Sequence, residues 1–201
     1  MEQLFDVVAT CRISDKEVLV NQESILYHSR ENEQDWLSTI YHHIGLQYPK
    51  FFKMDRLCKA GILGAELLLK DYTYDHETVK DDWGIILMNA ASSLDNDRHY
   101  QETISEDNYY PSPAVFVYTL ANIVTGEIAI RYKIGGESSF YVMPDFDEEL
   151  MRELLVQAFN ADPKLTHILY GWANVDQDQY DVRMFFCKRR GNIKTSINNP
   201  S

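Results

Sequence analysis

The pattern of apolar positions predicts one buried strand and two helices that each bury a single face. Residues 83–89 form a continuous apolar run, which is typical of a strand covered on both sides in a parallel sheet. Between residues 54 and 69, apolar side chains recur at steps of three and four, which predicts an amphipathic helix. A second such pattern spans 145–161, where Asp145 is the expected N-cap and Glu148 follows three residues later.

Weaker patterns complete the expected order of elements. Strands are expected at 4–10, 138–143, 166–173 and 180–187, with a short additional strand at 17–20. Helices are expected at 35–44 and 119–132, the second closed at Gly135-Gly136, and an acidic turn at 176–178 joins the last two strands. We therefore expect an α/β domain of three layers with a mainly parallel five-stranded sheet and a final hairpin.

The helix predicted at 145–161 carries a charged arc opposite its apolar side. The arc consists of Glu149, Arg152, Glu153, Gln157 and Asn160. We expect this helix to bury one face on its own sheet and to present the charged arc to water or to a polar partner.

Length and composition indicate an ordinary globular chain. The 201 residues, 45% hydrophobic and 25% charged, fit a single domain at 1–190 followed by a polar tail at 191–201. No apolar run approaches the length of about 20 residues that a membrane helix needs. Residues 1–6 do not resemble a secretory leader, so the expected location is the cytoplasm.

The distribution of charge argues against nucleic acid as a partner. The net charge is -12, and residues 71–107 carry ten acids against Lys80 and Arg98. The single basic run, residues 188–190, leads into the polar tail. Because nucleic-acid binding depends on clustered Lys and Arg, we expect no such activity.

The sequence contains little that points to metal or thiol chemistry. Cys11, Cys58 and Cys187 are widely spaced, which favours buried, reduced thiols. The six histidines are isolated, apart from the adjacent pair His42-His43, and the acidic stretch 71–82 lacks the pattern of a calcium loop. We expect neither a metal ion nor a cofactor.

Several short motifs together resemble the β-ketoacyl-acyl-carrier-protein synthases. A Ser-Pro at 112–113, Leu-Ala-Asn at 120–122, Gly-Glu-Ile-Ala-Ile-Arg at 126–131 and Gly-Gly at 135–136 follow the order and spacing of that family. Residues 52–57 and 87–97 resemble two further segments of it. The resemblance extends from Leu4 to Cys187, and it implies one half of a thiolase fold, the N-terminal half.

The same resemblance implies that the catalytic cysteine of the family is missing. In working ketosynthases that cysteine begins the helix after the short strand, and the count from Gly136 places this position at Pro144 or Asp145. Neither residue is a thiol nucleophile. The family's two active-site histidines belong to the C-terminal half, so we expect no catalytic residue here.

The resemblance also suggests partners. Ketosynthases dimerise through the strand equivalent to 138–143, so Ser138, Phe140, Tyr141 and Val142 form the candidate interface, with a ketosynthase or with a second copy. An alternative dimer that packs two copies of the helix at 145–161 would bring Glu149 and Glu153 near their symmetry mates. An acyl carrier protein is a further candidate, and its acidic surface would need the patch Lys50, Lys53, Arg56 and Lys59.

Two functions follow from these observations. The first is a non-catalytic, ketosynthase-like accessory subunit in fatty-acid, aryl-polyene or polyketide biosynthesis. The second is a small-molecule-binding protein or hydrolase that uses the loop after the strand at 83–89, where α/β proteins commonly place their sites. The candidate residues for this second function are Ser92, Ser93, Asp95, Asp97 and His99. A polar loop with capping carboxylates explains the same residues.

Overall fold

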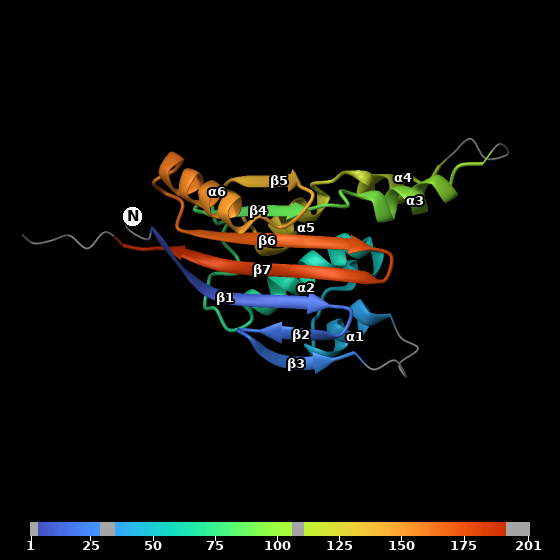
Figure 1. The fold of residues 1–201 in the computed structure, drawn as a ribbon, viewed down its shortest axis with the longest axis horizontal. Coiled ribbons are helices and arrows are strands. Elements are labelled where there is room, and N and C mark those ends of the chain that lie inside the picture. Colours follow the sequence, from blue (N-terminus) through green and yellow to red (C-terminus); the bar gives the residue numbers. More distant parts are fainter. Residues whose placement is uncertain (1–3, 29–34, 106–110, 192–201) are drawn as a thin grey trace, which may run out of the picture.

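The computed structural model describes residues 4–28, 35–105 and 111–191 and places seven strands in one sheet (Figure 1). Of the predicted polar tail, only Gly191 lies within the described residues. The strands are β1 (Phe5–Ser14), β2 (Glu17–Val20), β3 (Glu23–Tyr27), β4 (Trp83–Asn89), β5 (Ser138–Val142), β6 (His167–Asp176) and β7 (Gln179–Arg189). Their order across the sheet is β3-β2-β1-β7-β6-β4-β5.

The predicted five-stranded, mainly parallel sheet is wrong, because the sheet is mixed and larger. Only β5, β4 and β6 are mutually parallel, and β7, β1, β2 and β3 add to them as antiparallel neighbours. The final hairpin of β6 and β7 is confirmed. Asn21 and Gln22 both adopt positive φ and join β2 to β3 in a two-residue turn, so the chain returns without a crossover.

The core lies on both faces of the parallel strands. All seven residues of β4 are buried, with Ile85 and Leu87 packed on one face and Ile86 and Met88 on the other. The first face is covered by α1 (Trp36–His43), α2 (Arg56–Leu69) and α5 (Ile123–Tyr132), and the second by α6 (Glu148–Ala161). This gives the three layers expected from the sequence, with α6 as the one helix of the described residues on its side (Figure 1).

Helix α6 lies as predicted but begins two residues later. Its N-cap is Asp147, whose Oδ1 accepts a hydrogen bond from the amide of Leu150 at 2.9 Å, and not Asp145. Met151, Leu155, Ala158 and Phe159 are buried against the sheet, whereas Glu149, Arg152, Glu153, Gln157 and Asn160 are exposed. The expectation of one buried face and one charged face is therefore confirmed.

The helix predicted at 119–132 is shorter than expected. Residues 113–119 form the short helix α4 (Pro113–Phe116) and the 3-10 turn η2 (Val117–Thr119), and α5 begins at Ile123. Helix α5 ends at Tyr132 and its C-cap, Lys133, adopts left-handed φ, so Gly135-Gly136 do not close it. Gly136 instead allows the backbone to approach Trp83, because a Cβ there would lie 2.3 Å from the Trp83 carbonyl oxygen.

Two further helical elements were not expected from the sequence, and neither was strand β3. Helix α3 (Leu94–Glu102) follows β4, and the 3-10 turn η1 (Pro49–Lys53) precedes α2. Together α3, α4 and η2 extend from the carboxyl end of β4 (Figure 1). Among the described residues, no single helix has the length and apolar character needed to cross a membrane, although α4 with η2 and α5, bent by 100°, pass that test as a pair.

Two glycines test how closely the helices on the first face pack. A Cβ at Gly61 in α2 would lie 2.3 Å from Cγ2 of Val124 in α5, whereas a Cβ at Gly126 in α5 meets no atom within 4 Å. We expect Gly61→Ala to lower the free energy of unfolding by about 1–3 kcal/mol through overpacking. Gly126→Ala should raise it by about 0.5–1 kcal/mol through helix propensity. Urea denaturation of both variants checks the opposite signs, and equal effects would contradict this packing.

Candidate functional site

The loop after β4, at the carboxyl end of the parallel strands, is held by two asparagine side chains. Asn89 accepts a hydrogen bond from the Ser92 amide and donates one to the Ser92 carbonyl, both at 2.9 Å. Oδ1 of Asn174 in β6 accepts from the amides of Ala90 and Ala91 at 3.1 and 2.9 Å. These bonds hold Ser92 at a positive φ of 52° and set the start of α3.

The remaining candidate residues of the loop hold α3 in place. The Ser93 hydroxyl donates to the Thr119 carbonyl at 2.8 Å and lies 3.2 Å from the Asp97 carboxylate. Asp95 accepts from Arg56 at 3.2 Å and from the amide of Gln177 at 2.9 Å. The Ser93 hydroxyl and both carboxylates are therefore engaged in contacts that position the helix, whereas Ser92 takes part through its backbone.

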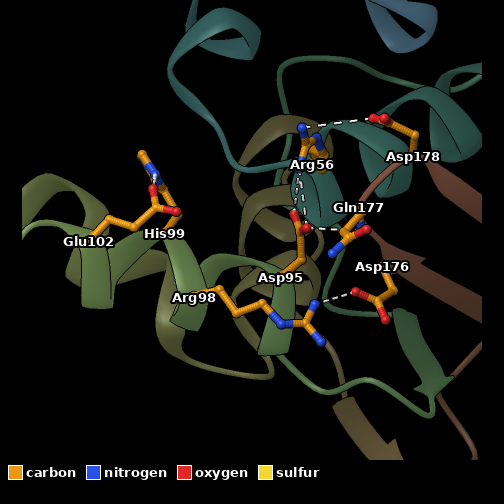
Figure 2. Close-up of polar contacts among 8 residues, drawn as sticks. All are labelled: Arg56, Asp95, Arg98, His99, Glu102, Asp176, Gln177 and Asp178. Carbon is orange, nitrogen blue, oxygen red and sulfur yellow. Dashed lines mark hydrogen bonds and ion pairs between the residues drawn. The ribbon is translucent and has the colours of Figure 1, made fainter.

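An ion-pair network joins three segments that are distant in sequence (Figure 2). Arg56 begins α2 and lies between Asp95 of α3 and Asp178 in the turn between β6 and β7, at 3.2 and 3.8 Å. Arg98 of α3 pairs with Asp176 at the end of β6. The network fixes α3 against the hairpin turn.

The fifth candidate, His99, does not join this network. Its Nδ1 lies 3.4 Å from the Glu102 carboxylate on the same helix, and both side chains are exposed. Figure 2 shows this pair away from the group around Arg56. The structure therefore brings Asp95 together with Arg56, but it does not bring His99 to the serines in a nucleophile, base and acid arrangement.

The positions expected for the family nucleophile lie in the loop between β5 and α6. Pro144 and Asp145 are exposed there, ahead of the true N-cap Asp147. Burial raises the pKa of the Cys11 and Cys187 thiols to about 12 and raises the pKa of Cys58 well above its ordinary value. Because the thiolate is the nucleophile, none of the three cysteines is prepared for acyl transfer.

The expected basic patch is partly neutralised. Lys50 pairs at 2.5 Å with Glu127, which is buried in α5, and Arg56 pairs with Asp95. The Lys59 ammonium lies 5.7 Å from the ring centroid of Phe51. Lys53 is exposed. Two of the four cations are thus already paired within the chain.

The expected interface strand forms an edge of the sheet. Strand β5 pairs with β4 on one side, and the sheet order ends there. Phe140 and Tyr141 are half-buried, Ser138 is exposed, and 53% of the Val142 side chain is exposed. The backbone groups on its outer side are therefore available for pairing.

A polar chain at the amino ends of β4 and β6 was missed from the sequence. The Tyr72 hydroxyl lies 2.7 Å from Nε2 of His167, Nδ1 of His167 lies 2.8 Å from Oγ1 of Thr166, and that hydroxyl donates to Asp82. Burial, assisted by Lys188, lowers the pKa of His167 to about 4. The signal was the position of Asp82 and Thr166 at the start of two neighbouring parallel strands.

The described residues contain no group of three or more His, Cys, Asp or Glu side chains that could hold a metal ion. The polar contacts at the carboxyl end of β4 centre on Asp95 and Asn174, and those at its amino end run from Tyr72 through His167 and Thr166 to Asp82. Their chemistry is that of structural hydrogen bonds and ion pairs.

Comparison with solved structures shows a ketosynthase-like fold. The ishigamide ketosynthase/chain length factor matches 93% of this chain with a TM-score of 0.64 and 13% identity. A ketosynthase in complex with its chain length factor from Xenorhabdus doucetiae matches 95% with a TM-score of 0.61 and 12% identity. The third match, an acyl-carrier protein in complex with its hexaketide-bound ketosynthase from a type II polyketide synthase, covers 94% with a TM-score of 0.60 and 12% identity.

The chain is shorter than these proteins. It spans 62%, 81% and 64% of the three matched chains, respectively. No family model matches the sequence, and no curated protein matches it. The similarity is therefore one of fold, and the activities of the matched proteins are not assigned to this chain.

The ion pair of Asp95 predicts a structural effect of mutation. Asp95→Ala removes the partner of Arg56 and the acceptor for the Gln177 amide, so the free energy of unfolding should fall by about 1–2 kcal/mol. Glu102→Ala changes an exposed carboxylate on the same helix and should stay within about 0.5 kcal/mol. Chemical denaturation of both variants is the measurement, and equal losses would contradict the assigned role.

The buried His167 predicts a pH dependence of stability. Its pKa is about 4 in the folded chain and near 6.5 when unfolded, so the unfolded chain binds a proton more readily as the pH falls. The free energy of unfolding of the wild type should therefore fall by about 2 kcal/mol between pH 7 and pH 5 because of this group. His167→Gln should lack that loss, whereas Tyr72→Phe should retain it. Urea titrations at the two pH values compare the three proteins, and an unchanged loss in His167→Gln would refute the assignment.

Proposed function

We propose that this protein is a non-catalytic, ketosynthase-like accessory subunit that partners a ketosynthase in fatty-acid, aryl-polyene or polyketide biosynthesis. The observation that carries the proposal is a ketosynthase-like fold whose cysteines are all buried with raised thiol pKa values. A fold can persist after its chemistry is lost, and function then depends on the surfaces that remain. Two of the structural neighbours are described as chain length factor proteins or complexes.

The edge of β5 supports a partner that adds a strand. The Ile85 amide donates to the Glu137 carbonyl and the Met143 amide donates to the Asn89 carbonyl, so residues 137 and 143 face β4. Along a strand, the backbone N–H and C=O groups of successive residues point alternately to one neighbouring strand and to the other. The amides of Ser138, Phe140 and Val142 therefore point to the open edge. These amides are the groups that a second strand would bind.

The charge distribution favours a partner subunit over a directly bound acyl carrier protein. The chain carries a net charge of -12, and Lys50 and Arg56 of the basic patch are paired with Glu127 and Asp95. An acidic carrier would meet a weak patch in a repulsive overall field. Carrier binding would then fall to the ketosynthase partner.

The proposal is tested by the mass of the protein in solution. Light scattering is measured on the pure chain, and again after mixing with a ketosynthase and an acyl carrier protein from the same organism. A stable complex with the ketosynthase is the expected result. If the chain forms no complex with either protein, the accessory role is contradicted.

A proline at the open edge tests the surface itself. Val142→Pro removes an amide that points away from β4, so the chain should remain folded while the complex weakens by at least about tenfold. Val142→Thr keeps the amide and the branched side chain, and it should bind as the wild type does. Titration calorimetry compares the two, with circular dichroism to confirm folding. Full binding by a folded Val142→Pro protein would exclude β5 as the interface.

A further inference from the structure

A second surface lies on the other side of α6 from β5. A groove of about 880 Å³ runs beside α6, over β7 and the start of β1. Its buried floor is formed by Phe5, Met151, Leu155 and Tyr170. Its partly exposed walls are formed by Leu4, Phe146, Val156 and Phe185.

Aromatic rings that line this groove stack on one another. The Phe185 ring stacks on Tyr170 with centroids 5.1 Å apart and on Phe146 at 6.3 Å. At the other end, Phe5 stacks on Phe159 of α6 at 5.7 Å. Side chains that line the groove are thus packed against one another, which lowers the cost of ordering them on binding.

Along β1 and β7, the apolar surface beside α6 gives way to charged residues. Strand pairing places Thr10 opposite Phe185 and Arg12 opposite Arg183, so these side chains share the face that α6 partly covers. Beyond Phe185, this face presents Arg12, Asp181 and Arg183 to solvent. The change from apolar to charged residues marks the boundary of the groove.

The rim of the groove is acidic. Residues 145–153 contain five acids and one arginine, and Glu148, Glu149 and Glu153 line the groove with Arg152. Glu149 and Glu153 are four residues apart, so they lie side by side on α6 at a cost to helix stability. Neither forms an ion pair within the described residues. An exposed like-charge pair on an apolar groove favours a cationic occupant.

The part of the uncovered face next to α6 is wide enough for a helix, and the face continues over β2 and β3. Helix α6 covers β4 and β6, and Figure 1 shows no described helix in front of β7 and β1. Two strands span about 10 Å, which is the diameter of an α-helix. A helix placed beside α6 would pack against it and cover β7 and β1.

We propose that this groove binds a basic amphipathic helix of a partner protein. Apolar side chains at helical spacing would contact Leu4, Phe146, Val156 and Phe185, and lysines or arginines would pair with Glu149 and Glu153. A second copy of this chain is a poor occupant, because its own α6 would bring the same acids to the rim. The groove is separated from the β5 edge by β6 and β4, so the proposal does not depend on a ketosynthase partner.

The test uses synthetic peptides as probes. A peptide of about 18 residues has leucines on one helical face and lysines on the other. A second peptide has the same composition in scrambled order, and a third replaces lysine by glutamate. Calorimetric titration at about 0.15 M salt should give a dissociation constant at least about tenfold lower for the first peptide than for the other two.

Three variants of the protein separate groove binding from general charge attraction. Glu149→Lys with Glu153→Lys should weaken binding of the amphipathic basic peptide by at least about tenfold. The control variant Glu23→Lys with Asp71→Lys changes the net charge by the same amount as the first variant, but at exposed positions away from the groove. It should weaken binding of the same peptide by less than about threefold. Val156→Glu adds an acid to the groove wall and should also weaken binding, although it increases the negative charge.

Particular outcomes would overturn the proposal. Equal affinity for the scrambled peptide, equal losses in the two lysine pairs, or tighter binding by a folded Val156→Glu protein would each leave only nonspecific attraction. Thermal unfolding confirms that every variant is folded. A dimer of the chain alone that Val156→Glu dissociates would instead assign the groove to a second copy. None of these results depends on whether β5 binds a ketosynthase.

Discussion

The arrangement of the molecule depends on the burial of β4 and β6 from both sides. Since successive side chains of β4 point to opposite faces and all are buried, the sheet must be covered twice. Helices α2 and α5 cover one face, where Gly61 allows their close approach, and α6 covers the other. This layering places the loops after β4 and β5 at the carboxyl ends of these strands, and it leaves open the outer edge of β5 and the α6-side face of β7 and β1.

Elements with a strong apolar pattern could be predicted, and elements formed by tertiary contacts could not. The run at 83–89 and the periodicity of α2 and α6 depend on burial that the sequence records directly. Helix α3 is polar and only Asn96 in it is buried, so no apolar periodicity in the sequence predicts it. Strand β3 depends on the turn at Asn21 and Gln22, which lacks the usual glycine signal. Asp145 and Asp147 are both suitable caps, and packing of α6 selects the second.

The residues of the candidate site could be named from the sequence, but their partners could not. Arg56 and Asp95 are 39 positions apart, and Lys50 and Glu127 are 77 apart, so only the fold brings them together. Considered alone, Lys50 and Arg56 indicated a free basic surface, and Ser93 and Asp95 indicated a reactive loop. The contacts assign these charges to fixing α2, α3 and α5. The buried state of the three cysteines followed correctly from their isolated positions.

The position of β7 has a consequence for how the chain folds. Strand β7 is the last of the described strands along the chain, yet it lies between β1 and β6 and pairs with both over nearly its full length. The β1–β3 meander therefore has no link to the rest of the sheet until β7 has been synthesised. Contacts between residues so far apart raise the contact order and slow folding. Until β7 has been made, the edges of β1 and β6 that it will pair with stay open, and open strand edges favour aggregation.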